Sequence, residues 1–223
     1  MNKKLTLPQT IIITLFCIMM ILAIFNMPQL GIFSIGVSAL FVVIATLSDR
    51  KGIFISIAMV ILGLVLFIKP IYIFDICLNF IIPGIIIGMI TKNVLNHRED
   101  NKYNPIFMGT IAFIIGLIAN YLISKYLFNI NILEEFTSVM KTQLSTQISA
   151  IQESVSSLAS VSNITEESII QTVLNIMPLI LFSRSIMLSI LTYFLAIYTL
   201  KKIRKNDLKE KLMQIKFSRF YLP

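Results

Sequence analysis

Four polar residues interrupt long apolar stretches of this sequence, and their types are the ones that could do chemistry there. They are Asp75, Asn79, Asn120 and Arg184. A charged side chain near the middle of a membrane-spanning helix costs about 2.5 to 3.5 kcal/mol on insertion scales, so it normally faces a partner or a water-filled cavity. Asp75 and Asn79 are four residues apart, which puts them on one face of a helix. The four residues therefore predict a polar pocket that binds a ligand inside a membrane.

The depth of each side chain follows from counting residues from the outer end of its predicted helix. At about 1.5 Å per residue, Asp75 lies about 6 Å deep, Asn120 about 9 Å, Asn79 about 12 Å and Arg184 about 15 Å. All four fall in the outer half, so the predicted pocket opens to the outside, with Asp75 and Arg184 as counter-ions and the asparagines as hydrogen-bonding groups. The alternative is a buried Asp75–Arg184 pair, or an Arg184 that only extends to the headgroups, with no ligand. The sequence leaves both open.

The sequence has no other set of residues with the spacing of a catalytic or metal site. It lacks paired carboxylates, a zinc-protease motif, a glycine-rich phosphate loop and a nucleophile with a nearby base. Cys17 and Cys77 are single thiols inside apolar runs, and His97 lies in a polar loop. We therefore expect no enzymatic activity, no cofactor and no metal.

The composition points to a lipid environment. Hydrophobic residues make up 57% of the 223 residues and charged residues 13%, against about 25% charged residues in a soluble domain. The net charge of +8 is not gathered with aromatic residues on a soluble face, which argues against a nucleic-acid partner. The lipid bilayer is the expected partner.

The elements that must position the four polar residues are apolar helices. Crossing about 30 Å of hydrocarbon takes about 20 helical residues. The sequence predicts an all-α, polytopic membrane protein with six transmembrane helices, at residues 7–25, 30–47, 53–68, 71–90, 106–126 and 176–200.

Basic residues predict the orientation, because lysine and arginine near helix ends are retained on the cytoplasmic side. Basic clusters at residues 3–4, 50–51, 92–102 and 201–205 follow alternate ends of the six predicted helices. All of them fall on one side if both termini are cytoplasmic. We expect a multi-pass protein of the cell membrane in that orientation.

The polar segment before the last helix, residues 127–175, is predicted to be an extracytoplasmic helical insertion. Its apolar residues recur at spacings of four and three, as on an amphipathic helix. A capping motif at Asn163–Glu166 predicts a second short helix. A plain connector, a lid over the pocket and a docking surface for another protein all remain open. The stripe of apolar residues consists of Phe136, Met140, Leu144, Ile148, Ile151, Val155 and Leu158.

Two further features complete the predicted organisation. Residues 1–200 form the transmembrane domain, with the insertion inside it, and residues 201–223 form a basic cytoplasmic tail that contacts anionic lipids. Small residues at helix-packing spacing predict close contact between helices, and Pro83 predicts a kink in the fourth helix. The small-residue pairs are Gly84 with Gly88, Ala112 with Gly116, Ser34 with Ser38, and Ser185 with Ser189.

The residues 83–88 (Pro-Gly-Ile-Ile-Ile-Gly), the six apolar helices, the insertion before the sixth and the closing residues 217–223 (Phe-Ser-Arg-Phe-Tyr-Leu-Pro) together resemble the YybS-like family of bacterial membrane proteins. That family is similar in architecture to the S components of energy-coupling-factor transporters. Members usually have tryptophan where Phe220 stands and continue into two more spanning helices, so the resemblance implies a short or truncated member.

The resemblance implies a membrane subunit that captures a small polar molecule from outside and works with separate coupling and ATPase subunits. The alternative, from a different class, is a scaffold or interaction protein of the cell envelope without transport activity. Its contact surfaces would be the external amphipathic segment and the basic tail. A cavity that reaches Arg184 from outside would favour the first reading, and a dry, closely packed bundle would favour the second.

Overall fold

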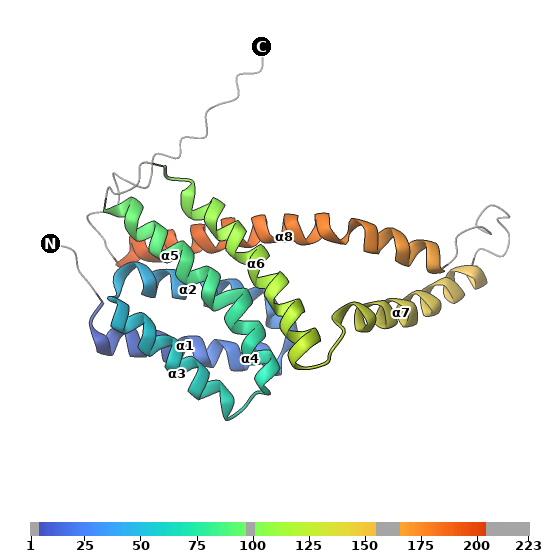
Figure 1. Ribbon diagram of the computed structural model, residues 1–223, viewed down its shortest axis with the longest axis horizontal. Helices are drawn as coiled ribbons and strands as arrows, with labels where there is room; N and C mark the ends of the chain where they lie inside the picture. Colours follow the sequence, from blue (N-terminus) through green and yellow to red (C-terminus); the bar gives the residue numbers. More distant parts are fainter. Residues whose placement is uncertain (1–4, 97–100, 155–165, 204–223) are drawn as a thin grey trace, which may run out of the picture. The chain divides into compact units, whose positions relative to one another are not determined.

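The computed structural model describes residues 5–96, 101–154 and 166–203, and these contain helices and turns and no strand. The chain is all-α, as the apolar periodicity predicts. In order, the elements are α1 (Leu7–Asn26), a 3-10 helix η1 (Pro28–Phe33), α2 (Ser34–Leu47), α3 (Arg50–Val65), α4 (Pro70–Ile76), a π-helical stretch η2 (Cys77–Ile81), α5 (Ile82–Leu95), α6 (Asn104–Leu127), α7 (Ile132–Ser154) and α8 (Glu166–Ile203) (Figure 1).

Five helical segments of the described residues are long and apolar enough to cross a membrane. The third predicted span is shorter. Its helix, α3, has 16 residues, which is about 24 Å at 1.5 Å per residue, less than the ~30 Å of hydrocarbon. It ends because a turn at residues 66–68 leads into Lys69 and Pro70, and Pro70 is the first residue of the next helix. The predicted count of six is therefore not confirmed. The five segments are Leu7–Asn26, Gln29–Leu47, Pro70–Leu95, Asn104–Leu127 and Glu167–Ile203.

The chain forms two compact units. The first unit comprises residues 1–117 and 185–223, and the second comprises residues 118–184. Helices α6 and α8 each contribute one part to both units. Each unit is described by itself below.

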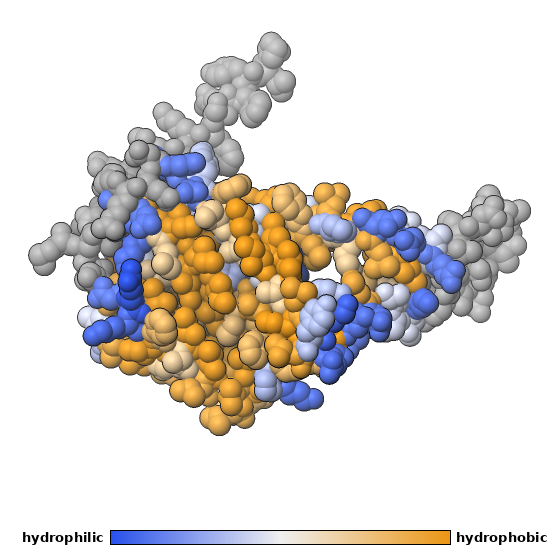
Figure 2. All heavy atoms as spheres, in the orientation of Figure 1, coloured by the Kyte–Doolittle hydropathy of each residue, from blue (hydrophilic) through white to orange (hydrophobic). Residues whose placement is uncertain are grey.

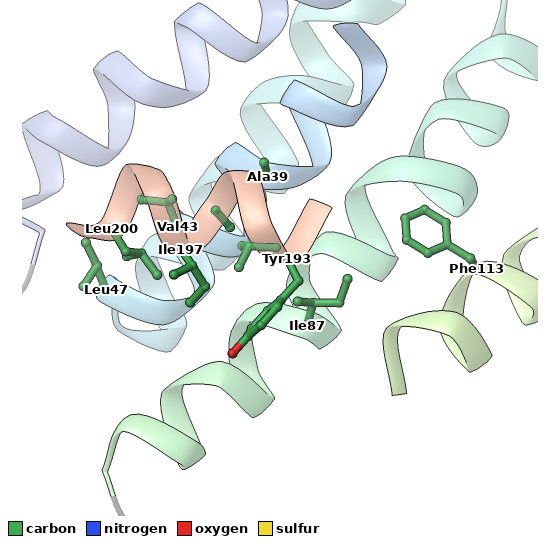
Figure 3. Packing of buried hydrophobic residues seen from close by; sticks show 10 residues of the cluster. Ala39, Val43, Leu47, Ile87, Phe113, Tyr193, Ile197 and Leu200 are labelled. Atoms are coloured by element: carbon green, nitrogen blue, oxygen red, sulfur yellow. The ribbon is translucent and has the colours of Figure 1, made fainter. Parts of the chain in front are cut away.

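Helix α2 is the centre of the first unit. Its residues from Val37 to Leu47 are buried except for Leu40, and they divide between two core clusters. One cluster joins α2 to α5, α6 and α8, and its members include Val43, Ile87 and Tyr193 (Figure 3). The other joins α2 to α1, α3 and the fourth span. A helix that is hydrophobic all round is buried all round, which is what this one shows.

Helices α2 and α5 pack with their backbones very close. A Cβ atom at Gly84 would lie 2.6 Å from the carbonyl oxygen of Ser38, and one at Gly88 would lie 2.6 Å from the Cβ of Ala45. The Ser38 hydroxyl donates to the carbonyl of Phe80 at 2.9 Å across the same interface. Glycine at both positions therefore lets the two helices approach in a way that no larger residue would allow.

The ends of the first unit's helices that carry basic residues lie together. The backbone N–H of Leu5 donates to the carbonyl of Leu47, and the Lys92 amine donates to the carbonyl of Ser48 at 2.8 Å. Leu47 and Leu200 lie at one end of the same core cluster (Figure 3). Hydrophilic side chains gather at this end of the unit in Figure 2, beside a broad hydrophobic surface. The basic residues at these helix ends are Arg50, Lys51, Lys92, Lys201 and Lys202.

The second unit contains α7 and the first half of α8. Helix α7 covers the predicted apolar stripe from Phe136 to Ile151, whereas Val155 and Leu158 lie outside the described residues. The capping residue Asn163 also lies outside them. The short helix that was predicted to lead into the sixth span is the beginning of one continuous helix, α8, of 38 residues with Pro178 inside it. The tail beyond residue 203 is outside the described residues.

Candidate functional site

The fourth span, Pro70–Leu95, is interrupted where its polar residues lie. Between α4 and α5, the residues Cys77–Ile81 form a π-helical stretch, in which the N–H of Ile82 donates to the carbonyl of Cys77, five residues earlier. Pro83, at the start of α5, follows directly. Proline has no N–H and disfavours the ordinary helical register before it, which accounts for the interruption at this place. The predicted distortion near Pro83 is therefore a π-helical turn on its N-terminal side.

The interruption takes both helical donors away from the carbonyl of Leu78. In an α-helix its donor would be the N–H of Ile82, but that group donates to Cys77. In a π-helix its donor would be the residue at position 83, which is proline. Gly116 of α6 packs on this carbonyl oxygen so closely that a Cβ at position 116 would collide with it. The Leu78 carbonyl is thus an acceptor that neither helical register satisfies.

Asp75 and Asn79 form a hydrogen-bonded pair across one turn of this span. The Nδ2 of Asn79 donates to the Oδ1 of Asp75 at 2.5 Å. Asp75 is half-buried, and Asn79 is 6% exposed. The sequence prediction that the two side chains share a face is consistent with this bond.

The hydrogen bond to Asp75 also determines which atom of the Asn79 amide takes no part in the pair. A carboxylate accepts hydrogen bonds and cannot donate them when ionised, so the amide must turn its nitrogen towards Asp75. Its oxygen then points elsewhere, and Oδ1 is buried without a hydrogen-bond partner among the described residues. Leaving such a group unsatisfied costs about 1 to 3 kcal/mol. The described part of the fourth span therefore presents a carboxylate, an amide oxygen and a backbone carbonyl within one turn, all of them acceptors.

The other two predicted pocket residues belong to the second unit. Asn120 is half-buried on α6, and Arg184 is exposed on α8, at the boundary of that unit. The structure brings Asp75 and Asn79 together. The grouping of all four residues around one ligand stays a prediction.

Helix α6 presents small residues to the first unit. Ala112 is 6% exposed, and Gly116 contacts the fourth span as described above. Sequence reasoning missed Gly109, at which a Cβ would collide with the Ser189 hydroxyl of α8 and lie 2.6 Å from Ile87 of α5. The signal was available, because Gly109 precedes Gly116 by seven residues and therefore lies on the same face of the helix.

Sequence reasoning also missed a set of buried hydroxyl groups that joins α1 to the connection between α2 and α3 and to α3 itself. The hydroxyls of Thr10 and Ser48 lie 3.1 Å apart, and the Thr14 hydroxyl donates to that of Ser56 at 2.9 Å. All four residues are buried. Such bonds hold helices together in lipid, where apolar burial no longer drives association. The spacing of the two threonines, four apart inside an apolar run, was the signal that could have found them.

Comparison with known proteins gives the chain a family. No curated protein and no solved structure matches it. The profile of a family described as "Predicted membrane protein (DUF2232)" matches residues 14–223. The comparisons give no support to the expected YybS-like naming or to a likeness to S components, and both stay predictions. The match covers nearly the whole chain, and its apolar helices agree with the description, so this integral membrane protein belongs to the DUF2232 family of predicted membrane proteins.

Proposed function

We propose that the chain is a membrane-embedded subunit that captures a small polar molecule from outside for uptake, with separate coupling and ATPase subunits supplying the energy. The observation that carries the proposal is the buried Oδ1 of Asn79, which has no hydrogen-bond partner in the described part of the chain and lies in an interrupted membrane span. Membrane transporters build their substrate sites from discontinuous helices of this kind, because the interruption frees backbone groups for a ligand. Single π-helical turns are likewise frequent at functional sites.

We also propose the topology that such a subunit needs: six spans, with both termini in the cytoplasm. The joint position of the basic helix ends of the first unit supports it, since basic residues are retained on the cytoplasmic side. In that orientation Asp75 and Asn79 lie in the outer half of the membrane, where a ligand from outside would reach them. Helix α3 must then cross by thinning the bilayer locally or through its apolar turn at residues 66–68.

The proposed role requires no catalysis by this chain. The groups assembled at the interrupted span are an amide, a carboxylate and a carbonyl, and they include no nucleophile with an adjacent base. We accordingly propose that the chain is not an enzyme and that energy comes from its partners.

The test is gentle purification of the tagged protein from its native membranes, followed by mass spectrometry of every protein and small molecule retained. We expect a small polar molecule together with ATPase and coupling subunits. Asn79→Leu, which keeps the branched shape and the number of heavy atoms of the side chain and removes the acceptor, should lose the molecule and keep the subunits. Asn93→Leu is the matched control, because Asn93 is exposed on α5 of the same span. Purification of the wild type without any ligand or energising subunit would contradict the proposal.

A second candidate function is that of an envelope scaffold or interaction protein. The observation that favours it is α7, a helix of 23 residues whose sequence carries one apolar stripe and a mostly polar remainder. Such a helix suits a groove on another protein as well as a membrane surface. Recovery of envelope proteins and no small molecule in the same purification would select this function.

A further inference from the structure

We infer that the group recognised at the interrupted fourth span is a cation. The inference deepens the proposed function, on which it rests, because it names the chemical class of the ligand at the same site. Its basis is the set of acceptor oxygens of Asp75, Leu78 and Asn79, which belong to one turn of the span.

Acceptor atoms outnumber side-chain donors at these three residues. The Asp75 carboxylate, the Leu78 carbonyl and the Asn79 Oδ1 accept hydrogen bonds or coordinate cations through oxygen. The only side-chain donor among these three residues is the Asn79 Nδ2, and one of its two hydrogens is donated to Asp75. A ligand group that is itself an acceptor would find only the second hydrogen of this amide among the side chains of these residues. A ligand group with positive charge would find all three complementary.

The Asn79 side chain, which carries one of these acceptors, belongs to a buried residue. Asn79 is only 6% exposed, and its Oδ1 has no hydrogen-bond donor within reach among the described residues. Gly116 of α6 is a neighbour of this oxygen, since a Cβ at position 116 would be in ordinary van der Waals contact with it, at 3.7 Å. The guest at this oxygen is therefore small or ends in a small group.

Two kinds of positively charged ligand suit these oxygen atoms. Oxygen ligands of this kind, from a carboxylate, an amide and a freed backbone carbonyl, suit a sodium or potassium ion, and freed carbonyls of broken membrane helices commonly bind such ions. They equally suit the ammonium group of a small organic amine. The two guests share one chemistry, a compact positive charge, and the experiment separates them.

The experiment uses the full chain in detergent, in a buffer whose only cation is the bulky N-methylglucamine. Sodium chloride, potassium chloride and methylammonium chloride are titrated separately, and the thermal midpoint is recorded at each concentration. A ligand that binds only the folded state raises the midpoint in a saturable way. We expect saturable stabilisation by at least one of the three cations. The size of the effect should not change when gluconate replaces chloride as the anion. Stabilisation by methylammonium alone identifies an amine site, and stabilisation by sodium or potassium alone identifies an alkali-ion site.

Variants of the two side chains tie the effect to the site. Asp75→Asn and Asn79→Leu should each weaken the apparent affinity at least tenfold, because each removes an acceptor. Asn79→Asp keeps the residue polar and adds charge, so it should bind the cation more tightly even if Asn79→Leu fails to fold. Asn93→Leu should leave the affinity unchanged. A linear response to all salts, or one that is equal in the wild type and in Asn79→Leu, would overturn the inference.

Two results separate this inference from the function on which it rests. If mass spectrometry recovers an anionic or neutral molecule that Asn79→Leu loses, capture stands and the cation is refuted. If cations bind as expected but no energising subunits are recovered, the cation site stands and the proposed transport role fails.

Discussion

The interface between α2 and α5 makes Gly88→Ala the most informative single substitution in the first unit. A Cβ at this position would lie 2.6 Å from both the Cβ of Ala45 and the carbonyl oxygen of Val42. Neither atom is the end of a flexible side chain, so relief requires the two helices to separate. Overpacking of a close interface costs about 1 to 3 kcal/mol. Alanine regains about 1 kcal/mol over glycine through helix propensity. We expect a net loss of about 1 kcal/mol in the free energy of unfolding.

Gly36→Ala is the matched control, because it makes the same change inside α2 of the same unit. A Cβ at Gly36 would meet only the terminal methyl group of Met20, at 3.0 Å, and that group can rotate away. The propensity gain of about 1 kcal/mol should then remain. The two variants should differ by about 2 kcal/mol, which is about 4 to 8 °C in thermal midpoint for a chain of this length.

Heating the detergent-solubilised protein with a thiol-reactive fluorescent dye measures this difference. Cys17 is fully buried in the core cluster that α2 shares with α1 and α3, so its reaction with the dye reports unfolding of the first unit. Both variants retain the same cysteines. If Gly88→Ala melts at or above the midpoint of Gly36→Ala, the close approach of α2 and α5 is not what stabilises the unit, and the reasoning is refuted.

Three further predictions use the same preparation or intact cells. Ser38→Ala loses its hydrogen bond across the same interface and should cost about 0.6 kcal/mol in the same melt, the average for such bonds in membranes; a loss above about 2 kcal/mol would show that the hydroxyl has a larger role. Lys69→Cys should react with a membrane-impermeant maleimide from outside intact cells and Lys51→Cys should not, and identical behaviour of the two would show that α3 does not cross. Pro83→Ala supplies an N–H to the π-helical stretch, so it should raise the free energy of unfolding by about 1 kcal/mol, seen as a higher thermal midpoint, and weaken cation binding at Asn79 in the salt titrations. Unchanged cation binding would separate the π-helical turn from the site.

The parts of the fold that could be predicted are those fixed by local sequence. The length of the apolar runs predicts where the spans lie, and five of the six predicted runs fall inside the five helical segments that are long enough to cross a membrane. The helical segments of the fourth span and of α8 extend further than the apolar runs that predicted them. The third predicted span, 53–68, overlaps α3, which begins at Arg50 and ends before the turn that leads to Pro70, and its crossing of the membrane stays a prediction. The sequence also predicted a short helix that leads into the sixth span, and the structure joins the two in one helix, α8. Capping residues mark where a helix can begin, but they do not show whether two neighbouring helices are continuous.

The candidate site was predicted in part. The four-residue spacing of Asp75 and Asn79 was enough to put them together, because neighbouring turns of a helix bring such residues into contact. The orphaned acceptors were not predictable from spacing. They arise because Pro83 changes the hydrogen-bond register of the residues before it and because Gly116 lets another helix reach the Leu78 carbonyl. The second of these is a consequence of packing between distant parts of the sequence. Arg184 was predicted to be the counter-ion of Asp75 from its depth in the membrane alone. The depth of a residue does not show which way its side chain faces.

The π-helical turn also has a consequence for the comparison of related sequences. A stretch with five-residue hydrogen bonds holds one residue more than an α-helix that rises to the same height, so it amounts to a single inserted amino acid within Cys77–Ile81. A relative without that insertion would show a one-residue gap in this stretch, and the part of its helix after the gap would be turned by about 100° relative to the part before it. Single-residue gaps at this point of an alignment would therefore divide the family into members that have the acceptor cluster and members that have an ordinary helix, before any of them is purified.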